Sequence, residues 1–277
     1  MHGIALGRGS VTVVGVTTEQ PLTLCIDIGG TKLKAALVNA AGQMVSARVR
    51  MDVRYPMEPG GLDGLVPRLV YLSEGLPRAD RVSVGFPGRV HKGIVLTGHK
   101  FIGKEGPGSE PDPDLALKWR NFSLGGALTD ALGLPVRVAN DADVQGAAVA
   151  AGPGFEVVIT LGTGVGSALF EDGVLLPHLE FAHHPFRKGE TYEEQLGEVA
   201  RLTIGDERWN RRVEEALVNF IALFACDTLH VGGGNAKKVN PQIVSGYEGR
   251  VVVVDNMAGI LGGVRLWEMP STLFGPV

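Results

Sequence analysis

The stretch LTLCIDIGGTKLKAALV, residues 22–38, joins two apolar runs through a pair of glycines. Leu22–Ile28 predicts a buried strand, Gly29–Gly30 a tight turn, and Lys32–Val38 a second strand that pairs with the first as a hairpin. A third strand near Arg48 would extend the hairpin into a meander. An antiparallel meander is therefore expected at the start of the folded chain.

The same pattern returns in the second part of the chain. Val157–Leu161 predicts a buried strand, Gly162-Thr-Gly-Val-Gly166 a turn, and Ser167–Phe170 a further strand. Gly162 follows Gly29 by 162 − 29 = 133 residues, which is close to half of the 277 residues. We therefore predict an internal duplication, although two glycine-rich hairpins can also resemble each other by chance.

Helices and strands are expected to alternate outside the two hairpins. The expected helices are Leu62–Glu74, Leu124–Leu132, Asp141–Ala150, Trp209–Phe224 and Ala258–Trp267, and the expected strands are Val82–Phe86, Val136–Val138, Thr228–Val231 and Val251–Val254. This alternation favours an α/β protein in which two similar lobes enclose a cleft. The stretch Gly103–Asp114 contains three prolines and predicts a surface loop, which is a candidate lid over the cleft.

Composition excludes several classes of protein. Hydrophobic residues make up 44% and charged residues 20% of the chain, as in folded globular proteins. The formal net charge of −4 leaves no general polycation for nucleic acid or an anionic membrane. Two cysteines build neither a disulfide framework nor a cysteine zinc cluster, and they favour a reducing cytoplasm. No apolar run approaches the ~18 residues of a membrane span, and the segment 1–20 is expected to be an extension or an edge strand.

Both glycine turns carry residues suited to phosphate. Asp27-Ile-Gly-Gly-Thr-Lys32 offers a carboxylate, bare backbone N–H groups, a hydroxyl and an ammonium, which suits phosphate and Mg²⁺, although a plain turn with a solvated lysine is also consistent. Neither turn has P-loop or dinucleotide-binding spacing. If the duplication holds, the two turns would face each other and clamp one polyphosphate chain.

Asn140-Asp141-Ala-Asp143 follows a predicted strand and begins a predicted helix. One interpretation is a helix cap with acids in the first turn, where the helix dipole favours them. The other is that Asp141 accepts a proton from a substrate hydroxyl as its oxygen attacks phosphorus. The two interpretations are compatible, because a capped aspartate stays ionised.

Two further segments could bind ligands. Leu179-Glu180-Phe-Ala-His183-His184, with Glu193 beyond it, suits the hydroxyls of a sugar, while His178, His183 and His184 could instead form a metal site. Val231-Gly-Gly-Gly-Asn235 could hold an adenosine or simply end a strand.

In this order, the segments resemble the ROK family of sugar kinases, which belongs to the actin-like (ribonuclease-H-like) two-lobed superfamily with a duplicated ββαβ-type core. The resemblance covers roughly Leu22–Trp267 and includes a Gly-x-Pro-Gly turn ending at Gly88. It implies that Asp141 is the catalytic base. It assigns the sugar to Gly88, Asn140, Glu180, His183 and Glu193, and the donor to Asp27, Gly29, Gly30, Thr31, Lys32, Gly162, Thr163, Gly164, Gly233, Gly234 and Asn235.

The polyphosphate glucokinase branch of the family is the most similar, since it shares the Asn-Asp-Ala-Asp form. The resemblance implies phosphoryl transfer from ATP or polyphosphate to a hexose such as glucose at O6, with Mg²⁺ near Asp27, and a homodimer. Pro185-Phe-Arg-Lys-Gly189 replaces the family's cysteine-rich loop, so no zinc is expected. Thr97-Gly-His-Lys100 stands where the family offers an asparagine to a sugar hydroxyl, which leaves the sugar open.

The resemblance also sets the expected lobes and the alternative functions. We expect an N-terminal lobe over residues 1–137, a C-terminal lobe over 138–256, and a C-terminal helix at about 257–277 that packs back on the first lobe. A sugar-responsive regulator and a catalytically silent sugar sensor are the alternatives. About 21 residues precede the first strand, which is too few for a helix-turn-helix module.

Overall fold

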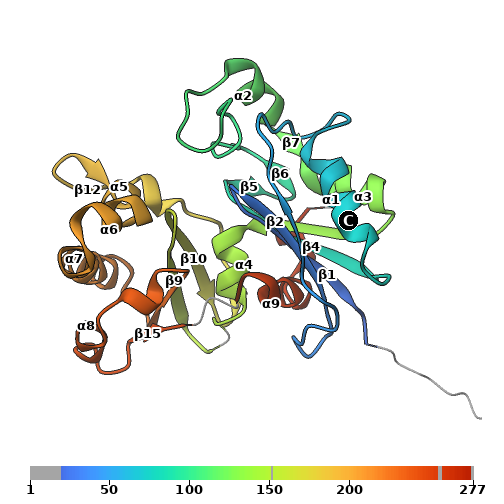
Figure 1. Cartoon of the computed structure of the whole chain (residues 1–277). Helices are drawn as coiled ribbons and strands as arrows, with labels where there is room; N and C mark the ends of the chain where they lie inside the picture. Colours follow the sequence, from blue (N-terminus) through green and yellow to red (C-terminus); the bar gives the residue numbers. More distant parts are fainter. Residues whose placement is uncertain (1–19, 151, 255–257, 276–277) are drawn as a thin grey trace, which may run out of the picture.

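The computed structural model describes residues 20–150, 152–254 and 258–275, and two sheets dominate it (Figure 1). The predicted extension or edge strand at the N-terminus falls on residues 1–19, which lie outside the described residues, as do residues 255–257 and 276–277 of the predicted C-terminal helix and its approach.

The two sheets have the same strand order. The first runs β3-β2-β1-β4-β8 and the second β11-β10-β9-β14-β15. In each sheet the opening hairpin is antiparallel and the following strands add in parallel. The strands are β1 Thr23–Ile28, β2 Lys32–Val38, β3 Val49–Asp52, β4 Arg81–Phe86, β8 Val136–Asn140, β9 Phe155–Leu161, β10 Val165–Glu171, β11 Val174–Leu175, β14 Thr228–Gly232 and β15 Val251–Val253. The predicted duplication is confirmed.

The two opening hairpins differ at their turns. Ile28 pairs with Leu33 in the first hairpin, so four residues, 29–32, lie between these paired positions. Leu161 pairs with Val165 in the second, so the connection spans only residues 162–164. The second turn is therefore one residue shorter than the first.

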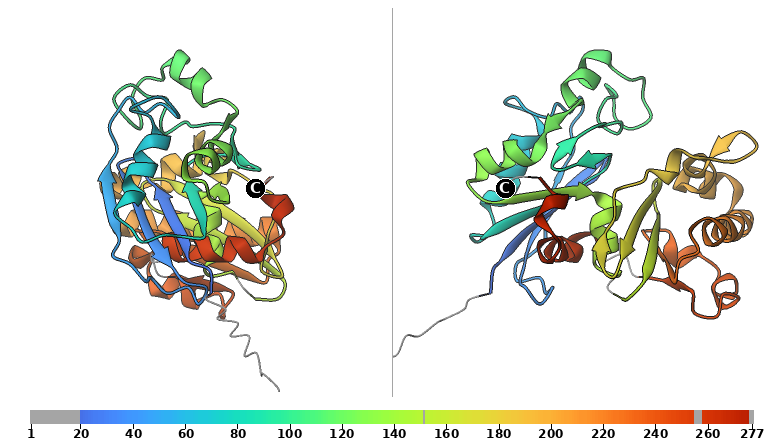
Figure 2. Two further views of the ribbon diagram at one scale, coloured as in Figure 1. Left: turned by 90° about the vertical axis from the view of Figure 1, so that its right-hand side faces the viewer. Right: turned by 180° about the vertical axis from the view of Figure 1, so that it is seen from behind.

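Helices cover the outer faces of the sheets, and two of them fill the space between the sheets (Figures 1 and 2). The α-helices of the described residues are α1 Leu65–Glu74, α2 Pro113–Trp119, α3 Leu124–Leu132, α4 Asp141–Ala147, α5 Tyr192–Leu196, α6 Glu198–Ile204, α7 Asp206–Phe224, α8 Pro241–Ser245 and α9 Ala258–Arg265. α4 contacts strands of both sheets, and α9 packs on β1, β2 and β4.

Close packing joins α4 and α9 in the middle of the molecule. A Cβ atom at Gly262 of α9 would overlap the backbone carbonyl of Val144 of α4, so the approach of the two helices requires a glycine. On the other side of α9, Ile260 and Val264 pack against Cys25 of β1 in a small buried cluster. The last α-helix of the described residues is therefore anchored on the first sheet beside the element that carries Asp141.

Several elements were not predicted from the sequence. In the small sheet of β5 Val90–His91, β6 Ile94–Val95 and β7 Phe122–Ser123, only a strand after Gly93 was expected, and it corresponds to β6. The hairpin β12 Pro185–Arg187 and β13 Glu190–Thr191 and the short helices α2, α5 and α6 were missed. These elements are short, and tertiary contacts decide them: buried Trp119 of α2 stacks on Phe101 and donates its indole N–H to the carbonyl of Met57. No helix in the described ranges is both long and apolar enough to span a bilayer.

Candidate active site

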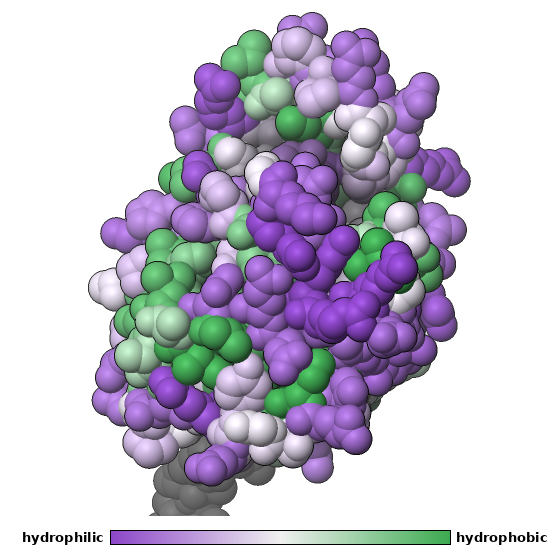
Figure 3. All heavy atoms as spheres, turned by 90° about the vertical axis from the view of Figure 1, so that its left-hand side faces the viewer, coloured by the Kyte–Doolittle hydropathy of each residue, from purple (hydrophilic) through white to green (hydrophobic). Residues whose placement is uncertain are grey.

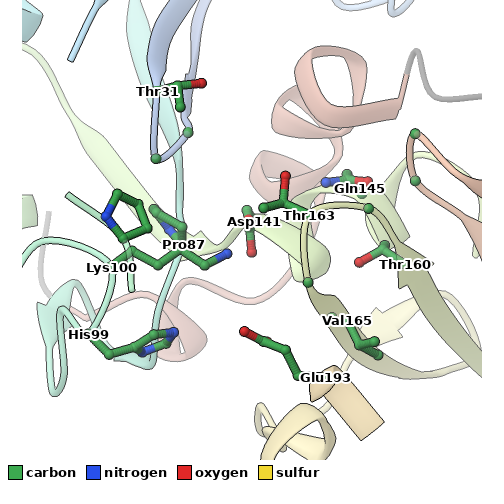
Figure 4. Close-up of a pocket in the computed structure, with 18 of the residues that line it drawn as sticks. Thr31, Pro87, His99, Lys100, Asp141, Gln145, Thr160, Thr163, Val165 and Glu193 are labelled. Atoms are coloured by element: carbon green, nitrogen blue, oxygen red, sulfur yellow. The ribbon is translucent and has the colours of Figure 1, made fainter. Parts of the chain in front are cut away.

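A cavity of about 340 Å³ lies where the two sheets face each other, and both halves of the chain line it (Figure 4). Ten of the predicted site residues line it: Gly29, Gly30, Thr31, Asp141, Gly162, Thr163, Gly164, Glu193, Gly233 and Gly234. Seven others, all within the described ranges, do not: Asp27, Lys32, Gly88, Asn140, Glu180, His183 and Asn235. The cavity thus brings together the two glycine turns and the candidate base.

Asp141 reaches the cavity because β8 ends at Asn140 and α4 begins at the next residue. The Asn140 side chain caps α4 by accepting a hydrogen bond from the Ala142 backbone N–H at 2.7 Å. Its amide group donates to the carbonyl of Gly88 at 3.0 Å. Both ends of this buried side chain are therefore used inside the protein, where they fix Asp141 relative to the Gly88 turn.

The electrostatic surroundings of Asp141 suit a base that works near neutral pH. Burial raises the pKa of its carboxyl to about 6, the Lys100 ammonium opposes the shift, and the nearby carboxylate of Asp27 adds to it. A general base is most effective when its pKa lies close to the working pH. At pH 7 most of the Asp141 population is ionised and able to accept a proton.

The first glycine turn is closed by a hydrogen bond from the Gly29 N–H to the carbonyl of Lys32 at 2.9 Å. Charged side chains flank this turn in pairs: Lys34 contacts Asp27 at 2.9 Å and Lys32 contacts Asp52 at 3.1 Å. The ammonium of Lys32 is therefore engaged on the outer side of the hairpin, outside the cavity lining.

The second glycine turn is held from two sides. The carbonyl of Gly162 accepts hydrogen bonds at 3.0 Å from the Asn235 side chain and from the backbone N–H of Glu198. On the cavity side, a Cβ atom at Gly164 would lie 2.7 Å from the carboxylate of Glu193. Buried Asn235 thus ties the third glycine cluster to the second turn rather than lining the cavity itself.

Outside the cavity lining, two acids and a histidine form a buried cluster that includes Glu180 of the predicted sugar-binding segment. His178 contacts the carboxylate of Asp143 at 3.0 Å and that of Glu180 at 3.5 Å, and all three side chains are largely buried. Burial alone would lower the pKa of His178, but the two carboxylates outweigh it and raise the pKa to about 10. The resulting imidazolium in turn lowers the pKa of Glu180 against the effect of burial.

The loop between β6 and α2 adds His99, which sequence reasoning missed, and Lys100. From the sequence, Lys100 was only one of six candidate cations for a basic track along polyphosphate, with Arg89, Lys92, Lys104, Arg187 and Lys188. His99 and Lys100 line the cavity, and His99 packs edge-on against His183 with ring centroids 5.3 Å apart. Burial, followed by the charge of Lys100, lowers the pKa of His99, so the ring is neutral at pH 7. The departure at Thr97–Lys100 from the family pattern was the signal for this segment, and the positive charge of Lys100 was a second signal for that residue.

Further lining residues come from neighbours of the predicted motifs: Pro87, Pro107, Gly108, Gln145, Thr160, Val165 and Gly166. Pro107 and Gly108 belong to the candidate lid Gly103–Asp114. A Cβ atom at Gly30 would lie 3.1 Å from the Pro107 side chain, so the loop covers the first glycine turn. Whether this loop opens and closes stays a prediction.

The residues near the first turn are compatible with a magnesium site in which phosphate oxygens of the donor, rather than protein side chains, supply most of the ligands. Mg²⁺ in phosphoryl-transfer sites takes one or two protein carboxylates and completes its shell with phosphate oxygens and water. Asp27 is largely buried, and one of its oxygens contacts Lys34. Its negative charge contributes to the raised pKa of Asp141, so the two carboxylates lie near enough to interact. The described residues form no cluster of three or more His, Cys, Asp or Glu suited to a metal.

Comparison with known proteins identifies the family to which this architecture belongs. A model of the ROK family matches residues 23–177. The chain belongs to the ROK family. The expected actin-like, two-lobed fold is also confirmed: the structure of the inorganic polyphosphate/ATP-glucomannokinase from Arthrobacter sp. strain KM superposes with a TM-score of 0.72 at 28% identity, covering 90% of this chain and 99% of that one.

Two relatives in this ROK family have different named acceptors. A polyphosphate glucokinase of Mycobacterium tuberculosis is 28% identical over 260 residues, which cover 90% of this chain and 91% of the relative. An N-acetylmannosamine kinase of Citrobacter koseri is 30% identical over 245 residues, covering 86% of this chain and 76% of the relative. Similarity at this level does not select one sugar.

Proposed function

We propose that this ROK protein is a sugar kinase that transfers a phosphoryl group from ATP or polyphosphate to a hexose hydroxyl, with O6 of glucose as the acceptor. One observation carries the proposal: the Asp141 carboxylate lines the same cavity as both glycine turns. An acceptor hydroxyl at Asp141 would therefore lie beside a phosphate chain held by the backbone N–H groups of the turns.

The reaction needs positioning and charge neutralisation more than covalent chemistry on the protein. Asp141 takes the proton of the acceptor hydroxyl while that oxygen forms a bond to the terminal phosphorus. The bond between this phosphorus and its bridging oxygen breaks, and the electron pair leaves with the shortened donor. Because the pKa of Asp141 is about 6, the proton can pass on to solvent afterwards at neutral pH.

The same proposal assigns roles to the other predicted residues, some in the cavity lining and some outside it. The N–H groups at Gly29, Gly30 and Thr31 and at Gly162, Thr163 and Gly164 would bind the donor phosphates. Glu193 would bind acceptor hydroxyls directly, with Glu180 and His183 beside it and Gly88 and Asn140 shaping the acceptor side. Gly233, Gly234 and Asn235 would support an adenosine, and Asp27 would hold Mg²⁺, which would neutralise donor charge. Lys32 stays a sequence-based prediction as a phosphate ligand.

The test is a matrix of initial rates, with ATP and polyphosphate as donors against glucose, mannose, fructose and N-acetylated hexosamines. Asp141→Asn should lower kcat by ~10²–10⁴, the usual contribution of a positioned general base, while leaving the fold intact. Asp130→Asn, a change of the same kind on the exposed surface of α3, is the control. Turnover by no donor and acceptor pair, or full activity of Asp141→Asn, would contradict the proposal.

A homodimeric assembly and a cytoplasmic location are part of the same proposal. On the outer end of the second half, hydrophobic patches lie among hydrophilic ones (Figure 3). Val199 and Leu202 of α6 and Val218 and Leu223 of α7 are exposed apolar side chains in this half. Light scattering after size-exclusion chromatography should give a mass near twice 29.2 kDa, and a monomeric mass would refute the dimer.

A further inference from the structure

The loop between β6 and α2 presents a lysine to the cavity. Among the described residues that line it, Lys100 is the single lysine or arginine. Its side chain extends toward Asp141 across the space between the two halves (Figure 4). A group that carries several negative charges would therefore meet one basic side chain inside this cavity.

The neighbouring lysines are engaged elsewhere. Lys32, Lys34 and Lys104 each contact a carboxylate, that of Asp52, Asp27 and Asp112 respectively, at 3.1, 2.9 and 3.8 Å. Within the ranges that the structure describes, no carboxylate lies within 4.0 Å of the Lys100 ammonium. This lysine is thus available to a ligand in a way that its neighbours are not.

A tyrosine ties Lys100 to the first glycine turn. The hydroxyl of Tyr55 donates to the carbonyl of Gly30 at 2.7 Å and lies 3.3 Å from the carbonyl of Lys100. Burial raises the pKa of Tyr55 to about 12, so the hydroxyl keeps the proton that it donates. The Tyr55 ring stacks on Phe101, the residue after Lys100. The backbone of Lys100 is therefore fixed relative to the turn that would bind phosphate.

These observations separate two roles for position 100. On the acceptor side, a lysine would donate to a sugar hydroxyl, as the asparagine of the family pattern does. On the donor side, it would neutralise the charge that gathers on the equatorial oxygens of the phosphoryl group in transfer. The link through Tyr55 to Gly30 and the free ammonium favour the donor side, since a hydroxyl needs no unpaired cation.

We propose that Lys100 binds the transferred phosphoryl group, and that Tyr55 is the positioning residue that holds Lys100 in register with the first glycine turn. This inference rests on the proposed kinase function. It identifies the positively charged side chain that would contact the phosphoryl group in that site. It makes Lys100 a catalytic residue of the first half, opposite the neutral turn of the second half.

The first experiment separates donor from acceptor by steady-state kinetics of the full chain. Lys100→Asn should lower kcat by about 100-fold and leave the acceptor KM within about threefold, and Lys100→Arg should recover at least a tenth of the activity. Lys104→Asn, on the same loop and exposed, is the matched control. An acceptor KM that rises more than tenfold in Lys100→Asn with kcat preserved would move Lys100 to the acceptor side and overturn the proposal.

The second experiment does not depend on turnover. Titration calorimetry with tripolyphosphate should show at least tenfold weaker binding to Lys100→Asn than to the wild type and to Lys104→Asn. Equal affinities would overturn the role of Lys100 even if kinase activity is established. A different outcome is that the wild type shows no kinase turnover while Lys100→Asn still binds tripolyphosphate more weakly than the wild type. That outcome would contradict the kinase function and leave Lys100 as an anion-binding residue.

Tyr55 is tested with the variant that removes only its hydroxyl. Tyr55→Phe should weaken tripolyphosphate binding several-fold without lowering the melting temperature, because the ring keeps its contact with Phe101. Tyr71→Phe, an exposed tyrosine of α1, is the control. Unchanged tripolyphosphate affinity in Tyr55→Phe would reject the positioning role, and a lower melting temperature with unchanged affinity would make Tyr55 purely structural.

Discussion

The two glycine turns occupy equivalent places in the two sheets, but the residues beside them differ in charge. In the first hairpin Asp27 lies in register with Lys34, and the two form an ion pair. At the same place in the second hairpin, Thr160 lies in register with Gly166. The first turn is therefore flanked by a carboxylate and an ammonium group, and the second by a threonine hydroxyl and a glycine.

Helix packing explains the difference. A Cβ atom at Gly166 would lie 2.5 Å from the Thr160 hydroxyl and 2.8 Å from the Cβ of Ala142, because the first turn of α4 packs there. The Lys34 side chain, by contrast, is partly exposed and reaches the carboxylate of Asp27 at 2.9 Å. The duplication thus repeats the backbone, while the position of α4 decides which copy can carry charged side chains.

Exchanging the residues at this place should give the largest effect. Gly166→Lys copies the first hairpin into the second, and it should destabilise the fold by about 3 kcal/mol, at the upper end of overpacking costs. The reverse change, Lys34→Gly, removes a partly exposed ion pair and should cost about 1 kcal/mol. Urea unfolding of both variants measures the two values, and equal losses would show that α4 is not the cause.

A change at the acid of the first turn should affect catalysis more than stability. Asp27→Thr copies the second turn into the first, and it should lower kcat by about 100-fold, or about 2.7 kcal/mol of barrier. The reason is that the carboxylate proposed to hold Mg²⁺ would be lost. Rates at increasing Mg²⁺ check this prediction. Thr160→Ser, at the matching place of the second turn, is the control, and a fall as large as that of Asp27→Thr would argue that the turns are functionally alike.

The stability of the second half is expected to depend on a buried charged histidine, His178. The charged pairs beside the first glycine turn are instead partly exposed at the surface. The pKa of His178 is raised to about 10 in the folded protein. Its stabilising contribution is therefore complete below about pH 6.5, the pKa of an unfolded histidine, and is lost as the pH rises through 10.

His178→Asn should remove this pH dependence, lower the melting temperature at pH 7, and raise the acceptor KM by about tenfold, or about 1.4 kcal/mol, since Glu180 loses its partner. Melting curves from pH 6 to 10 and acceptor saturation curves test both effects. His91→Asn, at an exposed position of β5, provides the comparison. A wild-type melting temperature that does not fall between pH 7 and 10 would refute the charged state of His178.

The smallest effect is expected at the outer ion pair of the first turn. The side chains of Lys32 and Asp52 are 49% and 77% exposed, so Lys32→Ala should cost under about 1 kcal/mol of stability. The KM of the Lys32→Ala variant for the phosphoryl donor should rise by less than about threefold, because the Lys32 ammonium is paired with Asp52 outside the cavity lining. Donor saturation curves provide the measurement, and a rise above tenfold would return Lys32 to the phosphate site.

Much of this architecture follows from local patterns. Strands β1 and β2 and helices α3 and α7 are long or strongly periodic, and their predicted bounds agree with the structure within a few residues. In the insertion that carries His99 and Lys100, only a strand after Gly93 and a loop over Gly103–Asp114 were expected. Its strands span two residues each and its helix seven, too short for periodicity to show.

The sequence by itself determined the duplicated hairpins, the helix cap at Asn140 and the two glycine turns, because each depends on residues within a few positions of one another. Only the tertiary structure decided that Asp141 and both turns share a cavity, that His178 joins two acids, and that Lys100 rather than Lys32 supplies the ammonium in the cavity. These relations join segments far apart in the chain. They depend on how α4 and α9 pack between two sheets, which no local pattern records.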